Sequence, residues 1–124
     1  RVQSIFRAAV RASYEDRCAV SGLAEPQLLV ASHIIPWSEN EERRADPTNG
    51  ILLNALLDRA FDRGLIAFDA ECRVLVSNRL EEAANAAVLN CSLNQLRGRT
   101  LTMPKRFRPD PAALEYHRRT QFRS

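Results

Sequence analysis

The stretch QLLVASHII, residues 27–35, constrains the fold more than any other part of the sequence. It is apolar and rich in β-branched side chains, a composition that favours a short strand. Pro36 follows directly, and because proline cannot donate a hydrogen bond to a neighbouring strand, the strand should end there. The next short apolar run, ILLN at residues 51–54, is a candidate second strand.

The segment between these two runs is polar throughout. Residues 38–48, SENEERRADPT, predict an exposed loop, and the Asn49-Gly50 pair that closes it is a strong turn signal. Residues 55–65, ALLDRAFDRGL, then predict a short helix that Gly64 caps. Residues 28–64 should therefore form a strand, a loop, a strand and a helix.

The flanking segments should bury this unit. Residues 2–15 have apolar side chains at helical spacing and predict an amphipathic helix with Arg7 and Arg11 on its polar face. The remaining elements are a hairpin, a helical region in pieces, an extended connector and a terminal helix that begins at Pro111, over residues 65–77, 78–98, 99–111 and 111–124. The predicted class is α+β.

Length and composition describe one ordinary globular domain. A chain of 124 residues with 45% hydrophobic and 27% charged residues suits one domain with one modest core, covering residues 1–124. No apolar run approaches the roughly 20 residues of a membrane span. The sequence begins at Arg1 without a Met, so we expect it to be a fragment of a larger protein.

The cysteines predict a reducing compartment. Cys18, Cys72 and Cys91 are far apart, odd in number and form no CxxC pair, and Ser21 stands where a second zinc thiolate would follow Cys18. We therefore expect no structural zinc, three buried small side chains and a cytoplasmic location.

The charge is concentrated at one end of the chain. Residues 1–96 carry 10 basic and 13 acidic side chains, whereas residues 97–124 carry 8 basic and 2 acidic ones, a net charge of about +6. Of the 18 basic residues 17 are Arg, which suits bidentate contacts to phosphate. The segment fits a polyanionic partner, and it fits a solvated surface equally well.

Four side chains of the strand–loop–strand–helix unit could carry chemistry together. His33 closes the first strand, Asn49 ends the loop, and Asp58 and Asp62 lie four residues apart on one face of the helix. Carboxylate oxygens suit Mg²⁺ or Mn²⁺, and a neutral imidazole suits proton removal from water.

Each of these residues also has a structural explanation. A lone histidine beside an apolar strand can be a core residue that bonds a backbone carbonyl. Asn49 tolerates the left-handed conformation of an Asn-Gly turn, and the two aspartates can pair with arginines. His117, the second histidine, is interpreted as a structural residue of the terminal helix. The joint occurrence of the four residues in one unit favours chemistry.

The segments CAVSG, LLVASHIIPWS and DPTNGILLNALLDRAFDRGLI, in this order and spacing, resemble the restriction-type branch of the HNH endonuclease family. GRTLTMP and PAALEYHRRTQF resemble the tail of that branch, so the resemblance covers nearly the whole chain. It implies a ββα-metal core over residues 28–64, flanked by terminal helices and a β-hairpin.

The resemblance also implies roles for the residues. His33 would be the general base that activates water, Asn49 would order the loop and the site, and one divalent ion would stabilise the transition state. His33, Asp58 and Asp62 are the predicted metal neighbours, and Asp62 is a direct or water-mediated ligand. Mg²⁺ or Mn²⁺ is the expected ion, with Zn²⁺ or Ni²⁺ as the alternative.

The sequence departs from the family pattern in two places. The last motif histidine is replaced by Asp58, which can still ligate a hard ion, but some relatives carry the histidine one residue earlier, where this chain has Leu57. If position 57 is the ligand position, the chain is a weakened, inactive or engineered form. Ser32 stands where other HNH branches have an acid or a histidine.

The sequence therefore predicts a metal-dependent HNH endonuclease domain of a restriction or defence protein that cleaves double-stranded DNA. The alternatives are a catalytically inactive HNH-fold module that binds nucleic acid, and a protein-interaction domain. A further domain outside this chain should read the sequence or a modified base. The predicted phosphate contacts are Arg43, Arg44, Arg97, Arg99, Lys105, Arg106, Arg108, Arg118 and Arg119.

Overall fold

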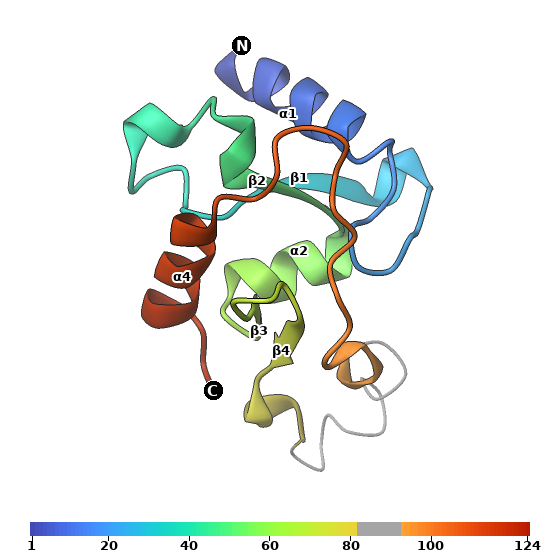
Figure 1. The fold of residues 1–124 in the computed structure, drawn as a ribbon, viewed down its shortest axis with the longest axis vertical. Coiled ribbons are helices and arrows are strands. Elements are labelled where there is room, and N and C mark those ends of the chain that lie inside the picture. Colours follow the sequence, from blue (N-terminus) through green and yellow to red (C-terminus); the bar gives the residue numbers. More distant parts are fainter. Residues whose placement is uncertain (82–92) are drawn as a thin grey trace.

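The computed structural model describes residues 1–81 and 93–124. Three helices and two small antiparallel sheets make up this part of the chain (Figure 1), so the predicted α+β class is confirmed. In chain order the elements are α1 (Val2–Ser13), β1 (Leu29–His33), β2 (Gly50–Asn54), α2 (Ala55–Asp62), β3 (Ile66–Phe68), β4 (Val74–Val76) and α4 (Pro111–Thr120).

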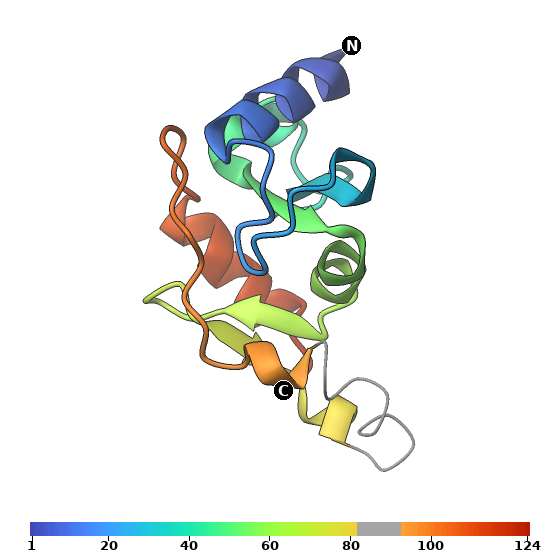
Figure 2. The same ribbon diagram turned by 90° about the vertical axis from the view of Figure 1, so that its right-hand side faces the viewer.

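The β1–β2 hairpin lies at the centre of the site region. The strands are antiparallel, in a register that runs from Leu29 opposite Asn54 to His33 opposite Gly50. Helix α1 covers one side of the hairpin and α2 the other, as both views show (Figures 1 and 2). The predicted unit of strand, loop, strand and helix is confirmed, and each sheet face has its own helix.

Close packing of α1 explains the glycine at the start of β2. Phe6 and Val10 of α1 are buried. A Cβ atom on Gly50 would lie 2.6 Å from Cζ of Phe6 and 2.7 Å from Cγ2 of Val10. Any larger residue at position 50 would therefore push α1 away from the strands.

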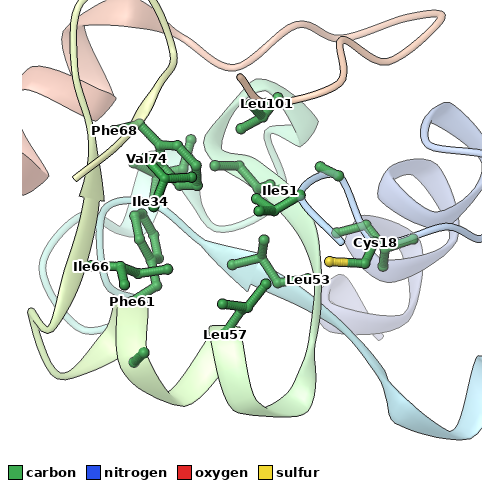
Figure 3. Packing of buried hydrophobic residues seen from close by; sticks show 14 of the residues in the cluster. Cys18, Ile34, Ile51, Leu53, Leu57, Phe61, Ile66, Phe68, Val74 and Leu101 are labelled. Carbon is green, nitrogen blue, oxygen red and sulfur yellow. The ribbon is translucent and has the colours of Figure 1, made fainter. Parts of the chain in front are cut away.

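The main core lies between the hairpin and α2 (Figure 3). Its fully buried side chains include Ile51 and Leu53 of β2 together with Leu57 and Phe61 of α2. Asn54 begins α2 by accepting a hydrogen bond from the backbone N–H of Leu57 at 2.9 Å, which is a standard N-cap. The sequence pattern and the cap agree on where α2 starts.

The β3–β4 hairpin and α4 complete the fold. Helix α4 packs beside β3 (Figure 1). Its side chains Ala113, Leu114 and His117 are buried. Gly64 has a φ of +73°, and a Cβ there would lie 2.0 Å from the carbonyl oxygen of Gln121. The predicted helix stop at Gly64 is confirmed, because only glycine allows this turn and this close approach.

Several local expectations need correction. The loop 38–48 is not irregular throughout, because short 3₁₀ helices span Glu41–Arg43 and Pro47–Asn49. Asn49 is not left-handed: it ends a 3₁₀ helix, and the positive φ angles of the described non-glycine residues lie elsewhere.

The expectations for the cysteines and for residues 78–98 also change in part. Cys18 is buried as expected, but Cys72 is only half-buried, since it lies in the exposed turn between β3 and β4 with a φ of +62°. Cys91 and the middle of residues 78–98 lie outside the described residues. The described ends of that region are 3₁₀ helices, Asn78–Glu81 and Asn94–Leu96. Within the described residues, no helix is long and apolar enough to cross a membrane.

Candidate active site

His33 is held at the end of β1 by three contacts. Its ring stacks on Phe6 of α1, with the ring centroids 3.8 Å apart and the planes 10° apart, and Trp37 meets it edge-on at 5.6 Å. Nε2 of the imidazole lies 3.0 Å from the backbone carbonyl oxygen of Arg44. The side chain is half-buried, so it is fixed in orientation and still reachable from solvent.

The carbonyl contact determines which ring nitrogen of His33 carries the proton in the neutral form. A carbonyl oxygen only accepts, so Nε2 must donate to Arg44. In a neutral imidazole the other nitrogen, Nδ1, then holds the lone pair and can accept a proton. The geometry thus presents Nδ1 as a base, which is the arrangement that proton removal from water needs.

Asn49 ties the loop to the hairpin. Its side chain is 1% exposed. Its Oδ1 accepts a hydrogen bond from the backbone N–H of Ile35 at 2.9 Å, and its Nδ2 donates to the Ile35 carbonyl at 3.1 Å and to the Arg43 carbonyl at 3.5 Å. Arg43 is the residue before Arg44, whose carbonyl holds His33. Asn49 therefore positions the Arg44 carbonyl through the loop backbone.

Ser32 and Asp58 meet on the other side of the hairpin. Successive strand residues point to opposite faces, so Ser32 faces α2 while its neighbour His33 faces α1. The hydroxyl of Ser32 donates to Oδ1 of Asp58 at 2.5 Å. Within the described residues, Oδ2 of Asp58 has no hydrogen-bond partner, so this carboxylate has one oxygen left for another ligand.

Asp62 and Leu57 lie away from this pair. The carboxylate of Asp62 is 62% exposed and lies 3.7 Å from the guanidinium of Arg63. The negative charge of Asp62 raises the pKa of the His117 imidazole, which offsets part of the lowering caused by burial. Leu57 is 1% exposed and belongs to the core, so position 57 of this chain points into apolar packing (Figure 3).

The predicted metal neighbours are therefore not gathered into one cluster. Within residues 1–81 and 93–124, no group of three or more His, Cys, Asp or Glu side chains is arranged to hold a metal. The oxygen donors of Ser32 and Asp58 nevertheless fit a hard cation, because Mg²⁺ commonly binds through one or two carboxylates and takes its remaining ligands from water and substrate phosphate. Zn²⁺ and Ni²⁺ generally prefer nitrogen and sulfur donors, which this pair does not supply.

Some of the arginines predicted to contact phosphate form bonds within the protein. Arg43 forms an ion pair with Asp110 at 2.5 Å. Arg44 donates to the Trp37 carbonyl, and its guanidinium lies 4.7 Å from the centroid of the Trp37 ring. Both arginines thus shape the loop around His33.

The basic residues of the C-terminal quarter are divided in the same way. Arg97 and Arg118 donate to the carbonyls of Val76 and Phe68, so both help to hold the sheet region together. The other predicted phosphate contacts of this quarter lie on the surface as exposed side chains, some of them beside an acidic or aromatic partner: Arg99, Lys105, Arg106, Arg108 and Arg119. Contact of this surface set with DNA stays a prediction.

The structure adds residues that the sequence did not single out. Phe6 supplies the surface on which His33 rests, and the Arg44 carbonyl fixes its proton. A groove of about 430 Å³ between α1 and β1 reaches His33 and is lined by Arg7 and Arg11. The only sequence signal for this groove was the position of the two arginines on the polar face of the first helix.

Comparisons with known proteins agree with this picture. Residues 18–69 match the family model for HNH endonucleases. Among solved structures, the fold is similar to that of a modification dependent TagI restriction endonuclease, with a TM-score of 0.66 and 20% sequence identity. The alignment covers 96% of this chain and 38% of that protein, so this chain spans well under half the length of its structural relative. No curated protein matches the sequence.

The matched segment begins before β1 and ends after β3, so it contains the β1–β2 hairpin, the loop and α2. It includes His33, Asn49 and Asp58, the residues whose geometry is described above. The likeness of the described chain to a restriction endonuclease at the level of the fold extends over the flanking elements as well. Residues 18–69 are therefore similar to HNH endonucleases, and the fold of the described chain is similar to that of a restriction endonuclease.

Proposed function

We propose that this domain hydrolyses phosphodiester bonds of double-stranded DNA with the help of a divalent metal ion, and that His33 is the general base. The observation that carries the proposal is the fixed imidazole at the end of β1, with Nε2 donating to the Arg44 carbonyl and the ring stacked on Phe6. A side chain held in this way keeps Nδ1 oriented while remaining half-exposed. General bases need this combination of fixed geometry and access.

The proposed chemical step uses His33 directly. Nδ1 takes a proton from a water molecule as the water oxygen bonds to phosphorus. The bond from phosphorus to the 3′ oxygen breaks, and this oxygen leaves with the bonding electrons and takes up a proton from solvent water. Phe6 prevents the ring from tilting, and Asn49 keeps the loop carbonyl in place so that Nε2 retains its proton. Asn49 is accordingly a positioning residue in this proposal.

The cation would lie beside Asp58 and Ser32. When bound, it supplies positive charge that stabilises the charge developing on the phosphate oxygens. Asp58 would contribute Oδ2, with Ser32 holding the other carboxylate oxygen. Mg²⁺ or Mn²⁺ suits this oxygen set, and the remaining ligands would be water and phosphate. Asp62, turned toward solvent, would act at most through water.

The wider role is proposed from the comparisons. The relative in the structural match is a modification dependent restriction endonuclease in which this fold occupies only part of the chain. We propose that this domain likewise belongs to a restriction or defence protein of the cytoplasm. The sequence or the modified base would be read by a further domain.

A second candidate is a nucleic-acid-binding module that keeps the fold without the chemistry. The hydrogen bond between Ser32 and Asp58 favours this candidate, because the carboxylate that would hold the cation is already partly engaged. A module of this kind would bind DNA and leave it intact.

One experiment separates the two candidates. The purified domain is incubated with supercoiled plasmid and Mg²⁺ or Mn²⁺, and a gel-shift assay is run with a labelled duplex. Nicking or linearisation by the domain, lost in the His33→Ala variant, is the result that the nuclease proposal predicts. A shifted duplex without cleavage in either metal overturns the nuclease proposal and supports the binding module. If the domain neither cleaves nor shifts DNA, the third candidate, a protein-interaction domain, is supported.

A further inference from the structure

We propose that the groove between α1 and β1 binds the sugar–phosphate backbone of the DNA strand that leads to His33, with Arg7 and Arg11 contacting neighbouring phosphates. This inference rests on the proposed nuclease function and assigns the path of its substrate. The predicted phosphate contacts from sequence lay in the loop and the C-terminal quarter, so this surface is a different one.

The groove is formed by elements that also hold His33. Its volume is about 430 Å³, and its walls are α1, with Arg7 and Arg11, and β1, with Leu29 and Ala31. Phe6 lines it too, and the same ring stacks on His33. A strand lying in this groove therefore passes directly beside the imidazole.

The charge of the groove distinguishes it from the neighbouring cavity. None of its described lining residues is an aspartate or a glutamate, and its charged members are both arginines. The neighbouring cavity, of about 670 Å³, contains Glu41 and Glu42 beside Arg1 and Arg44. The α1–β1 groove attracts a polyanion, whereas the mixed charges of the neighbouring cavity give no net attraction. The α1–β1 groove is therefore the better path for DNA.

The spacing of the two arginines suits two nearby phosphates of one strand. Residues four apart on a helix lie on one face, about 6 Å apart along the axis. One strand of a DNA duplex carries a phosphate about every 3.4 Å of the duplex axis. Arg7 and Arg11 thus span roughly two nucleotide steps.

Arg11 can change partners at small cost. Its Nε lies 2.6 Å from Oδ1 of Asp16, but both side chains are substantially exposed, at 32% and 52%. Exposed ion pairs contribute only about 0–1 kcal/mol, whereas a guanidinium can bind phosphate through two parallel hydrogen bonds. Arg7 is exposed and lies on the same face of α1.

The test measures the salt dependence of DNA binding with cleavage switched off. Fluorescence anisotropy of a labelled duplex is followed against salt concentration in the His33→Ala background, with and without Arg7→Gln and Arg11→Gln together. Each lost phosphate contact should flatten the plot of log affinity against log salt by about 0.9, so the double variant should lose close to two units of slope. The Arg7→Lys and Arg11→Lys pair should keep most of the slope, because the charge remains.

The matched control removes the same charge elsewhere. Arg63→Gln with Arg73→Gln neutralises two exposed arginines that, like Arg11, form surface ion pairs, and neither lines the groove. An equal loss of slope in this pair, or an unchanged slope in the groove pair, overturns the assignment of the groove. Arg7→Gln alone, an exposed change, repeats the test with about half the effect if the double variant unfolds.

Failure of the groove and failure of the nuclease function remain distinguishable. If the groove pair leaves the salt slope unchanged while the parent chain still nicks plasmid, the substrate path is wrong and the nuclease stands. If the parent chain neither binds nor nicks DNA, both proposals fall.

Discussion

The two histidines of this chain have nearly the same local packing and very different surroundings. His33 stacks on Phe6 and His117 stacks on Phe61, each with ring centroids 3.8 Å apart and with planes 10° and 12° apart. Each Nε2 also faces a backbone carbonyl, at 3.0 Å for His33 and 2.8 Å for His117. Ring stacking and a carbonyl partner therefore do not by themselves make a candidate base.

Access and neighbours separate the two. His117 is 1% exposed, and its burial lowers the pKa of the imidazole, although the Phe61 carbonyl and Asp62 act in the opposite direction. Within the described residues its Nδ1 has no hydrogen-bond partner. His33 is half-buried, lines a groove with two arginines, and directly follows the serine that binds Asp58. The same ring contacts thus build a structural residue at one place and a candidate catalytic residue at the other.

The largest expected effect comes from removing His33. His33→Ala should lower the rate of DNA cleavage by about 10²–10⁴, because a general base contributes roughly that much. Its thermal transition should stay close to that of the parent chain, since the side chain is only half-buried. Plasmid nicking and thermal unfolding of the same preparation check this. A variant that loses its folded state would show that His33 is a structural residue like His117.

Removing His117 should lower the stability of the fold and leave the cleavage rate nearly unchanged, the reverse of removing His33. His117→Ala takes away a buried ring and leaves the Phe61 carbonyl without its donor, so the free energy of unfolding should fall by about 2–4 kcal/mol. At a temperature where the variant is still folded, its cleavage rate should stay within a few-fold of the parent. Urea unfolding and single-turnover cleavage measure the two effects. A rate loss as large as that of His33→Ala, with the fold intact, would remove the distinction between the histidines.

The carboxylates of α2 extend the comparison, because Asp58 belongs to the region of His33 and Asp62 to that of His117. Asp58→Asn should weaken Mg²⁺ or Mn²⁺ binding by roughly 10–100-fold, a typical cost of disturbing a metal site. Asp62→Asn, a matched change on the same helix, should have little effect on it. Calorimetric titration of both variants with the metal tests this. Equal weakening by both would restore the two-aspartate site expected from the sequence.

The smallest expected effect is the pH dependence that His117 adds to stability. Burial lowers its pKa in the folded state, so between the folded value and the unfolded value of about 6.5 the unfolded chain binds more protons. Stability is therefore full above about pH 6.5 and falls as the pH drops toward the folded pKa. His117→Gln should flatten this decline. Asp110, whose pKa is lowered by its hydrogen bond with Arg43, affects only more acidic conditions.

Urea unfolding of the parent chain and His117→Gln at pH 8, 7, 6 and 5 measures the decline. Parallel curves for the two chains would show that His117 is not held neutral in the fold. If stability falls less steeply with decreasing pH in the variant than in the parent chain, the buried histidine causes this part of the pH dependence.

Much of the fold could be predicted from sequence because its signals are local. The apolar run before Pro36 forms β1, and Asn54 and Gly64 bound α2, so these elements follow from neighbouring residues alone. His33 and Asn49 were found because they end elements that such signals define. Their assigned roles stay predictions.

The parts that sequence missed depend on distant contacts. Phe6 lies 27 positions before His33, and no local pattern says that the two rings meet. Asp58 and Asp62 share a helix face, as expected, but four residues also separate them by about 6 Å along the axis. Ser32 therefore meets only Asp58, while Asp62 lies a turn further on, toward α4 and His117.

Chemical rescue of His33→Gly tests the central claim most directly. Removing the side chain should leave space beside Phe6, and added imidazole can occupy it and supply the missing base. With saturating metal and single-turnover conditions, the rate of plasmid nicking should rise with imidazole concentration and level off, while His117→Gly gains nothing. A folded, DNA-binding His33→Gly variant whose activity imidazole does not restore, or one that cuts as fast as the parent chain without it, would contradict the account of His33 as the general base.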